Sequence, residues 1–296
     1  MSREYIVTCC STVDLDKAFL EEKEIPYIAM HYRIGDQEFA DDLYTSITAE
    51  EFYKQIEEGA EPVTSQLNQE EYMKFWEPYV REGRDILHLT LSSGISGTIN
   101  SARLAAEALM ETYPEAQIVV VDSLAASSGY GMLTVTAREN QLAGMDIHEN
   151  AAWIEAHRNQ LHHWFFSTDL TSYIRGGRVS KVSGFVGTVL KICPLLNVNC
   201  EGKLIPREKS RGRKKAIQDI FAKMQKHVQN GTDYTGKVYM CHSADYKDAR
   251  AVADLIEAAY PSIEGKVKIN NIGTVIGSHS GPGTVAVFFW GDERTE

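Results

Sequence analysis

Short apolar runs alternate with amphipathic segments along the first half of the chain. Apolar runs such as Tyr5–Cys9 and Ile86–Leu91 predict strands, whereas the amphipathic pattern of Ile47–Glu58 predicts a helix that begins with Thr48 and Glu51 at capping-box spacing. By the same criteria we expect strands at Ile28–Tyr32 and Gln117–Val121, and helices at Asp14–Glu22, Gln69–Val80, Thr98–Tyr113, Ser127–Leu142 and Ile147–Leu161. Strands and helices in alternation favour a doubly wound, mostly parallel sheet.

A predicted hairpin distinguishes the second half of the chain. Its strands, Pro194–Asn199 and Lys203–Ile205, flank the turn Cys200–Gly202. We also expect strands at Trp164–Ser167, Lys237–His242, Val267–Ile272 and Val285–Phe289, and helices at Gly212–Val228 and Asp245–Ala259. The sequence therefore predicts an α/β fold of two domains, with a doubly wound N-terminal domain over 1–160 and a smaller α+β domain over 161–296.

Charge and apolar content exclude several classes of partner. The 296 residues carry a net charge of −11, which disfavours nucleic acid as a partner because phosphate binding needs a basic face. Apolar runs such as Val285–Trp290 are far shorter than the roughly 20 residues of a membrane span, so we expect no stable membrane insertion. No secretory signal is apparent, and the five cysteines form no CxxC pair, which together favour a cytoplasmic protein with reduced thiols.

Serine and glycine are concentrated in the stretch LTLSSGISGTINS, residues 89–101, between a predicted strand and a predicted helix. Gly94 and Gly97 would let a ligand approach the backbone, Ser93 and Ser96 offer hydroxyl donors, and a helix N-terminus adds unpaired N–H groups. An oxyanion site and a plain turn capped by Ser96 explain this pattern equally well. The stretch has neither the lysine of a P-loop nor a GxSxG pattern, so a nucleophilic serine is disfavoured.

Two further polar stretches are candidate binding elements. Thr64 and Ser65 precede a predicted helix, and either could simply cap it. His279 lies in a predicted loop among three glycines and two serines. Because a histidine there could donate to an anion or exchange a proton near neutral pH, we favour a functional role for His279 over an ordinary surface position.

Basic residues form two more candidate sites, whereas metal and dinucleotide sites are not predicted. Arg178 belongs to an Arg-Gly-Gly-Arg stretch, which could bind a carboxylate or simply form a charged surface turn. Residues 206–215 are rich in basic side chains and form either a solvated face or a docking patch for an acidic partner. The adjacent His162 and His163 are poorly spaced for one metal ion. Gly129 and Gly131 lack the third glycine of a dinucleotide motif.

Taken in order, these stretches resemble the motifs of the DegV family of bacterial lipid-binding proteins. The corresponding segments are TCCST (8–12), TSQ (64–66), LSSGISGTINSA (91–102), DS (122–123), GGRVS (176–180), KSRGRKKA (209–216) and SHSGPG (278–283). The resemblance covers nearly the whole chain. It implies that a long-chain fatty acid, with no other cofactor, is buried between the two domains.

The resemblance also assigns roles to individual residues. The carboxylate contacts of the family correspond to Thr64 and Ser93, with His279 close by, and the same motifs contain Ser65, Gly94 and Ser96. It implies a protein that is not itself an enzyme. Such a protein presents the acyl carboxylate to a separate ATP-dependent kinase subunit and retains the acyl-phosphate. The basic positions associated with that encounter correspond to Arg178, Arg211 and Arg213.

Two features leave the functional assignment open. Cys10 occupies the position of an aspartate in the family motif, so the orientation of that loop is in doubt. An alternative function is a serine hydrolase or a phosphoryl-transfer enzyme that uses Ser93 or Ser96 with His279. That alternative would need an acidic partner for His279, and none is near it in the sequence.

Overall fold

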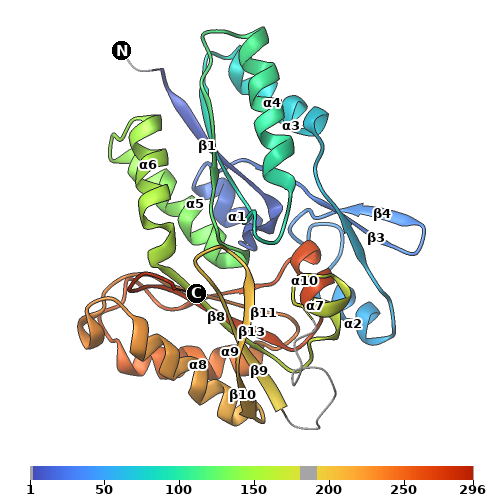
Figure 1. The fold of residues 1–296 in the computed structure, drawn as a ribbon, viewed down its shortest axis with the longest axis vertical. Coiled ribbons are helices and arrows are strands. Elements are labelled where there is room, and N and C mark those ends of the chain that lie inside the picture. Colours follow the sequence, from blue (N-terminus) through green and yellow to red (C-terminus); the bar gives the residue numbers. More distant parts are fainter. Residues whose placement is uncertain (1–2, 181–191, 296) are drawn as a thin grey trace.

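A four-stranded parallel sheet lies at the centre of the first half of the computed structural model, which describes residues 3–180 and 192–295. Its strands, in the order β2-β1-β6-β7, are β2 (Tyr27–Ile28), β1 (Tyr5–Cys10), β6 (Asp85–Thr90) and β7 (Ile118–Asp122). Helices α3 (Gln69–Arg81) and α4 (Thr98–Thr112) pack on one face, and α5 (Ser127–Leu142) and α6 (Ile147–His157) on the other (Figure 1). This arrangement is the predicted doubly wound sheet.

Local capping explains where several helices begin. Helix α2 (Ala49–Glu57) starts with the predicted capping box, in which the Glu51 N–H donates to Thr48 Oγ1 at 3.2 Å. Helix α3 has an equivalent box between Asn68 and Glu71, so Asn68 is the cap rather than Thr64 or Ser65. The predicted helix from Asp14 is shorter, because Asp14 adopts a left-handed conformation with φ of 46° after a 3₁₀ turn (Ser11–Val13), and α1 spans Lys17–Glu22.

A small antiparallel sheet contains two strands that the sequence pattern did not predict. It has the order β4-β3-β5, with β4 (Gln37–Ala40), β3 (His31–Ile34) and β5 (Val63–Ser65). The predicted strand Ile28–Tyr32 was wrong as one element, because its first residue belongs to β2 and its last two to β3. Pairing of β5 with β3 fixes Thr64 and Ser65 in extended backbone.

The second half is built on a six-stranded mixed sheet in which only β11 and β12 pair in parallel. In the order β10-β9-β8-β13-β11-β12, the strands are β10 (Leu204–Arg211), β9 (Ile192–Val198), β8 (Leu161–Ser167), β13 (Thr284–Trp290), β11 (Val238–His242) and β12 (Lys268–Asn271). The predicted hairpin is confirmed as β9 and β10. The remaining helices are α7 (Thr171–Arg175), α8 (Arg213–His227), α9 (Tyr246–Ala259) and α10 (Thr274–Ser280), with 3₁₀ turns at Arg158–Gln160 and Gly231–Asp233.

Side-chain alternation gives this sheet two buried faces. On β8, Trp164 and Phe166 join the hydrophobic cluster under α8 and α9, whereas Phe165 joins a larger cluster that also contains residues of the first half. Helix α5 packs against both β1 and the inner face of the six-stranded sheet. The two-part α/β fold is therefore confirmed, while the boundary at residue 160 stays a prediction because one core runs through both parts.

The segment around His279 differs from its prediction. Residues Thr274–Ser280 form the short helix α10, and only the glycine-rich residues after Ser280 turn into β13. Tyr53, on α2, packs against Gly277 of α10 and donates a hydrogen bond of 2.7 Å to the Ile272 carbonyl just before that helix. Such contacts stabilise a helix of seven residues that is too short to persist alone.

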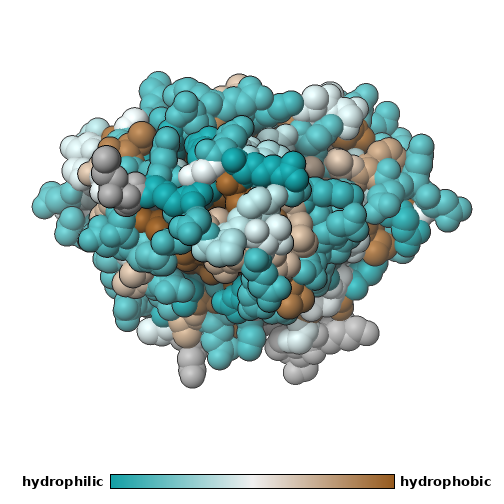
Figure 2. All heavy atoms as spheres, turned by 90° about the horizontal axis from the view of Figure 1, so that it is seen from above, coloured by the Kyte–Doolittle hydropathy of each residue, from teal (hydrophilic) through white to brown (hydrophobic). Residues whose placement is uncertain are grey.

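The outer surface is mostly hydrophilic on the face shown in Figure 2, where hydrophobic residues occur in small groups. Over residues 3–180 and 192–295, no helix is both long and apolar enough to cross a bilayer. The exposed large hydrophobic side chains among these residues are Val63, Leu104, Leu142 and Tyr246.

Candidate functional site

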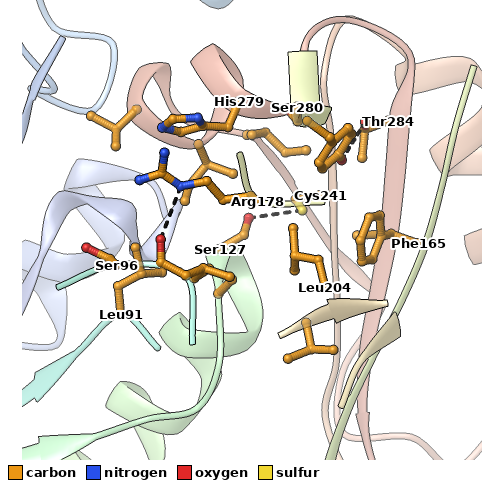
Figure 3. Close-up of a pocket in the computed structure, with 18 of the residues that line it drawn as sticks. Leu91, Ser96, Ser127, Phe165, Arg178, Leu204, Cys241, His279, Ser280 and Thr284 are labelled. Atoms are coloured by element: carbon orange, nitrogen blue, oxygen red, sulfur yellow. Dashed lines mark hydrogen bonds between the residues drawn. The ribbon is translucent and has the colours of Figure 1, made fainter. Parts of the chain in front are cut away.

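A cavity of about 160 Å³ lies between the two halves of the molecule. The β6–α4 turn, the start of α5, the inner face of the six-stranded sheet and α10 form its walls (Figure 3). Most of the lining side chains are apolar or largely so: Met30, Leu91, Ile95, Ala126, Phe165, Tyr173, Val198, Leu204, Cys241, Ile272, Val275, Ile276, Ala286 and Phe288. Such a lining suits a long apolar ligand better than a compact polar one.

Polar groups cluster at one end of this cavity. The Thr64 Oγ1 and His279 Nε2 atoms are 2.8 Å apart, although the residues are separated by 215 positions in the sequence. Ser65 and Ser96 also line the cavity, and Figure 3 shows Ser96, Arg178 and His279 together on its left side. The structure therefore brings four of the predicted ligand-binding residues, Thr64, Ser65, Ser96 and His279, to one cavity.

His279 is held neutral at physiological pH. Burial, followed by the positive charges of Arg178 and Arg175, lowers its pKa to about 4. Its Nδ1 atom is buried and has no hydrogen-bond partner among the described residues, because a close approach of the Gly176 backbone closes that side of the ring. A buried N–H without an acceptor is costly, so we assign the proton to Nε2, which then donates to Thr64 Oγ1.

Arg178 lies in the wall of the cavity rather than on a free surface. Its Nε donates to the Ile95 carbonyl at 3.1 Å and its Nη1 to the Gly176 carbonyl at 2.5 Å. Burial lowers the pKa of its half-buried guanidinium from the ordinary value. Because both of these acceptors are neutral carbonyls, neither contact neutralises the positive charge that Arg178 places at the polar end of the cavity.

Ser93 and Gly94 line an adjoining hollow instead of the cavity itself. Gly177, Arg178 and Lys203 contribute to the same hollow, which shares Ser96 and Arg178 with the cavity. Ser93 is exposed, and its backbone N–H donates to Asp122 Oδ1 at 3.1 Å. Of the two serines, Ser96 lines the cavity together with Thr64, whereas Ser93 lines the adjoining hollow, so the role of Ser93 as a carboxylate contact stays a prediction.

The serine- and glycine-rich turn also has a structural role that the sequence did not reveal. A Cβ on Gly94 would stand 2.6 Å from the Glu201 carbonyl oxygen and 2.7 Å from the Gly202 carbonyl. Ser92 Oγ donates to the Gly202 carbonyl at 2.8 Å. The tip of the β9–β10 hairpin thus packs directly on this turn and closes one side of the interface between the two halves.

The remaining basic candidates lie away from the cavity. Arg211 is exposed at the end of β10. Arg213, at the start of α8, contacts Asp245 Oδ2 at 2.6 Å and Asp248 Oδ2 at 3.0 Å through its Nη1. Arg213 therefore forms ion pairs within the protein while about half of its side chain stays exposed, whereas Arg211 is exposed to solvent.

Cavity residues that sequence inspection did not single out come mainly from the strands. Phe165, Ala286 and Phe288 alternate with residues of the outer core, and only the register of β8 with β13 places them together. Ser127 also lines the cavity, begins α5 with a φ of 54° and donates to the buried Asp14 carboxylate. The sequence itself carried no mark of that backbone strain.

Comparison with known proteins decides the family. The family model described as "Uncharacterised protein, DegV family" matches residues 6–292. The chain belongs to the DegV family. A DegV domain-containing protein of Clostridium perfringens is 37% identical over 292 residues, covering 99% of each chain. A fatty acid-binding protein of Thermotoga maritima is 32% identical over 279 residues, covering 93% of each chain.

The DegV architecture is also reproduced in solved structures. A structure reporting fatty acid binding of a DegV family protein from Thermus thermophilus matches with a TM-score of 0.86 and 28% identity, over 98% of this chain and 99% of that one. These relatives are named as binding proteins, in agreement with the prediction of a lipid-binding protein rather than an enzyme. In this DegV chain His279 contacts Thr64, and no hydrogen bond joins it to a serine or a carboxylate among the described residues.

Proposed function

We propose that this DegV protein binds one long-chain fatty acid, with the acyl chain along the apolar walls and the carboxylate at the end formed by Thr64, Ser96 and His279. The observation that carries the proposal is a mostly apolar cavity between the two halves in which the hydrogen-bonded pair Thr64 and His279 lies with Ser96 and Arg178. Each methylene removed from water contributes about 0.8 kcal/mol, so a long chain would bind tightly. The fatty acid binding of its DegV relatives supports this assignment.

The polar end supplies hydrogen-bond donors suited to a carboxylate. Burial of a carboxylate is costly unless donors replace its hydration. The Thr98 N–H donates to Ser96 Oγ at 3.3 Å, which leaves the Ser96 hydroxyl proton free for a ligand. With Nε2 of His279 donating to Thr64, the Thr64 hydroxyl proton is likewise free. Arg178 adds positive charge, and among the described residues its hydrogen bonds go to two neutral carbonyls rather than to a carboxylate.

Direct identification of the ligand tests this proposal. Mass spectrometry of the purified protein under native conditions should show one bound fatty acid, which extraction would identify. Loss of one hydrogen bond to a charged group costs about 1.5–3 kcal/mol, or roughly 10–100-fold in affinity. We therefore expect Thr64→Val and Ser96→Ala each to weaken fatty acid binding by about that factor.

Ser93→Ala provides the matched control in the same turn. Because Ser93 is exposed in the adjoining hollow, we expect its loss to change fatty acid affinity less than twofold. If Ser93→Ala weakens fatty acid affinity more than Ser96→Ala does, the carboxylate lies in the hollow beside Ser93, which is the contact that the family resemblance implies. A protein that neither carries nor takes up any fatty acid would overturn the proposal.

We also propose that the protein presents the bound carboxylate to a separate ATP-dependent kinase. The motif resemblance and the exposed basic cluster around Arg211, on an otherwise acidic protein, support this role. Arg211→Glu should abolish acyl-phosphate formation by an added acyl kinase subunit while leaving the fatty acid content unchanged. Arg103→Glu, an exposed substitution on α4, is the control. Equal activity of the two variants would contradict docking through Arg211.

A further inference from the structure

A cluster of two imidazoles and one carboxylate lies on the outer side of the six-stranded sheet. His162 Nε2 is 2.8 Å from Asp292 Oδ1, and His227 Nδ1 is 3.1 Å from the same oxygen. All three ligand atoms lie within 4.8 Å of one another. His163, the next residue of β8, faces the fatty acid cavity, so strand alternation places the His162 cluster on the opposite side of the sheet.

Stacked rings fix the orientation of both imidazoles. The His162 ring stacks on Phe289 with centroids 5.3 Å apart, and the His227 ring stacks on His162 at 4.8 Å. Trp164 covers His227 at 5.8 Å. The rings of Phe289, His162, His227 and Trp164 therefore stack in a nearly parallel series that restricts rotation of both imidazoles. Because the side chains are already ordered, binding of a ligand would cost little further side-chain entropy.

Backbone contacts fix the main chain that carries Asp292. The Asp292 N–H donates to the His227 carbonyl at 3.0 Å, and Gly291 pairs with Val228 in an isolated bridge. A Cβ on Gly291 would stand 2.2 Å from the His227 carbonyl oxygen, so only glycine allows this close approach. The end of α8, the start of β8 and the segment after β13 thus converge on one point.

The donor set matches a zinc-type ion. Zinc binds imidazole nitrogen and carboxylate oxygen at about 2.0–2.2 Å, which places neighbouring ligand atoms of a tetrahedron roughly 3.3 Å apart. The separations of 2.8 and 3.1 Å from Asp292 need small outward shifts, and the two imidazole nitrogens, which lie within 4.8 Å of each other, can approach by a small rotation of the partly exposed His227 ring toward the ion. Asp292 is 61% exposed, so an ion has a path from solvent and a fourth position for water. Arg294, the nearby cation, donates to backbone carbonyls and would weaken, not block, such a site.

We propose that His162, His227 and Asp292 form a binding site for one zinc-type divalent transition-metal ion. The ion replaces the imidazole protons that otherwise hold the cluster together, and it fastens the segment after β13 to α8 and β8. The site is independent of the fatty acid cavity, because the sheet separates the two.

Zinc titration of the full chain tests this site. The protein is first stripped with a chelator and then titrated with Zn²⁺ near neutral pH by calorimetry, with Tm measured in parallel. We expect one equivalent to bind and to raise the Tm. Asp292→Asn and His227→Gln should each weaken zinc binding at least about tenfold. These residues are less buried than His162, so their replacement should leave the fold and fatty acid content intact.

His157→Gln is the control, since His157 lies on α6 and contacts the Trp153 carbonyl instead of the cluster. Zinc affinity should be the same in this variant as in the unmodified chain. A Co²⁺ complex with the absorption of a tetrahedral ion would support the geometry. Weak binding of several equivalents, or binding unchanged in Asp292→Asn, would show an adventitious ion only and overturn the proposal.

Discussion

Substitution of Gly94 by alanine should loosen the contact between the two halves. The new Cβ would stand 2.6 Å from the Glu201 carbonyl oxygen and 2.7 Å from Gly202 carbonyl atoms. An ordinary carbon–oxygen contact is longer by most of an ångström, and both neighbours are backbone, so the hairpin tip has to move. Overpacking of this kind costs about 1–3 kcal/mol. Reduced entropy of the unfolded chain offsets about 0.4–1 kcal/mol of this cost, which leaves a net loss of about 0–2.6 kcal/mol, with a central value of about 1.3 kcal/mol.

Urea unfolding of Gly94→Ala, compared with Gly97→Ala, measures this cost. At Gly97 the new Cβ would meet the side-chain amide of Gln66 at 3.1 Å, which can rotate away, so a smaller loss is expected. Ser92→Ala weakens the same contact by removing the hydrogen bond to the Gly202 carbonyl, and we expect it to lower the free energy of unfolding by about 1 kcal/mol. If Gly94→Ala unfolds at the same urea concentration as the unmodified protein, the hairpin does not pack on this turn as described.

Three further predictions concern titration, thiol exposure and ion pairing. Burial lowers the pKa of His88 to about 3 and the pKa values of His242 and His279 to about 4. Because the unfolded chain then binds more protons than the folded protein, the free energy of unfolding should fall as the pH drops from about 6.5 to about 4. In urea titrations, His279→Gln should reduce the slope of that fall. Cys200 is the one cysteine that is not buried, so a single thiol should react quickly with Ellman's reagent in the folded state. Arg213→Met leaves the largely buried Asp245 and Asp248 unpaired and should lower the free energy of unfolding by about 1–2 kcal/mol, with no change in fatty acid content. An unchanged unfolding curve would contradict the ion-pair role of Arg213.

Elements with strong local determinants could be predicted from the sequence. The α2 helix begins where Thr48 and Glu51 predict it, because both partners of a capping box lie within one turn. The β9–β10 hairpin and the core strands also appear where the apolar runs are. Elements stabilised by distant contacts could not be predicted. Strand β5 has three residues and exists through pairing with β3, and α10 depends on contacts such as that with Tyr53.

The candidate site shows the same limit at the level of single side chains. Hydroxyl donors in a strand-to-helix turn were expected, but Ser93 and Ser96 are only three positions apart and the sequence does not say which faces the cavity. That choice is made by Asp122, which binds the Ser93 N–H, and by the hairpin that presses on Gly94. Both come from other segments of the chain, so no local pattern contains the answer.

Glycine in the shared motifs is better explained by close packing between motifs than by direct contact with an anion. Gly94 has no room for a side chain because the β9–β10 hairpin reaches its backbone. Gly176 has none because His279 Nδ1 would lie 2.2 Å from a Cβ there. In each case a glycine of one motif makes space for a backbone or side chain of another, and together they bring Thr64, Ser96 and His279 to the same end of one cavity. We therefore expect a side chain at Gly176 to displace His279 and to weaken the proposed fatty acid binding, as we expect for Thr64→Val, although Gly176 itself does not line the cavity.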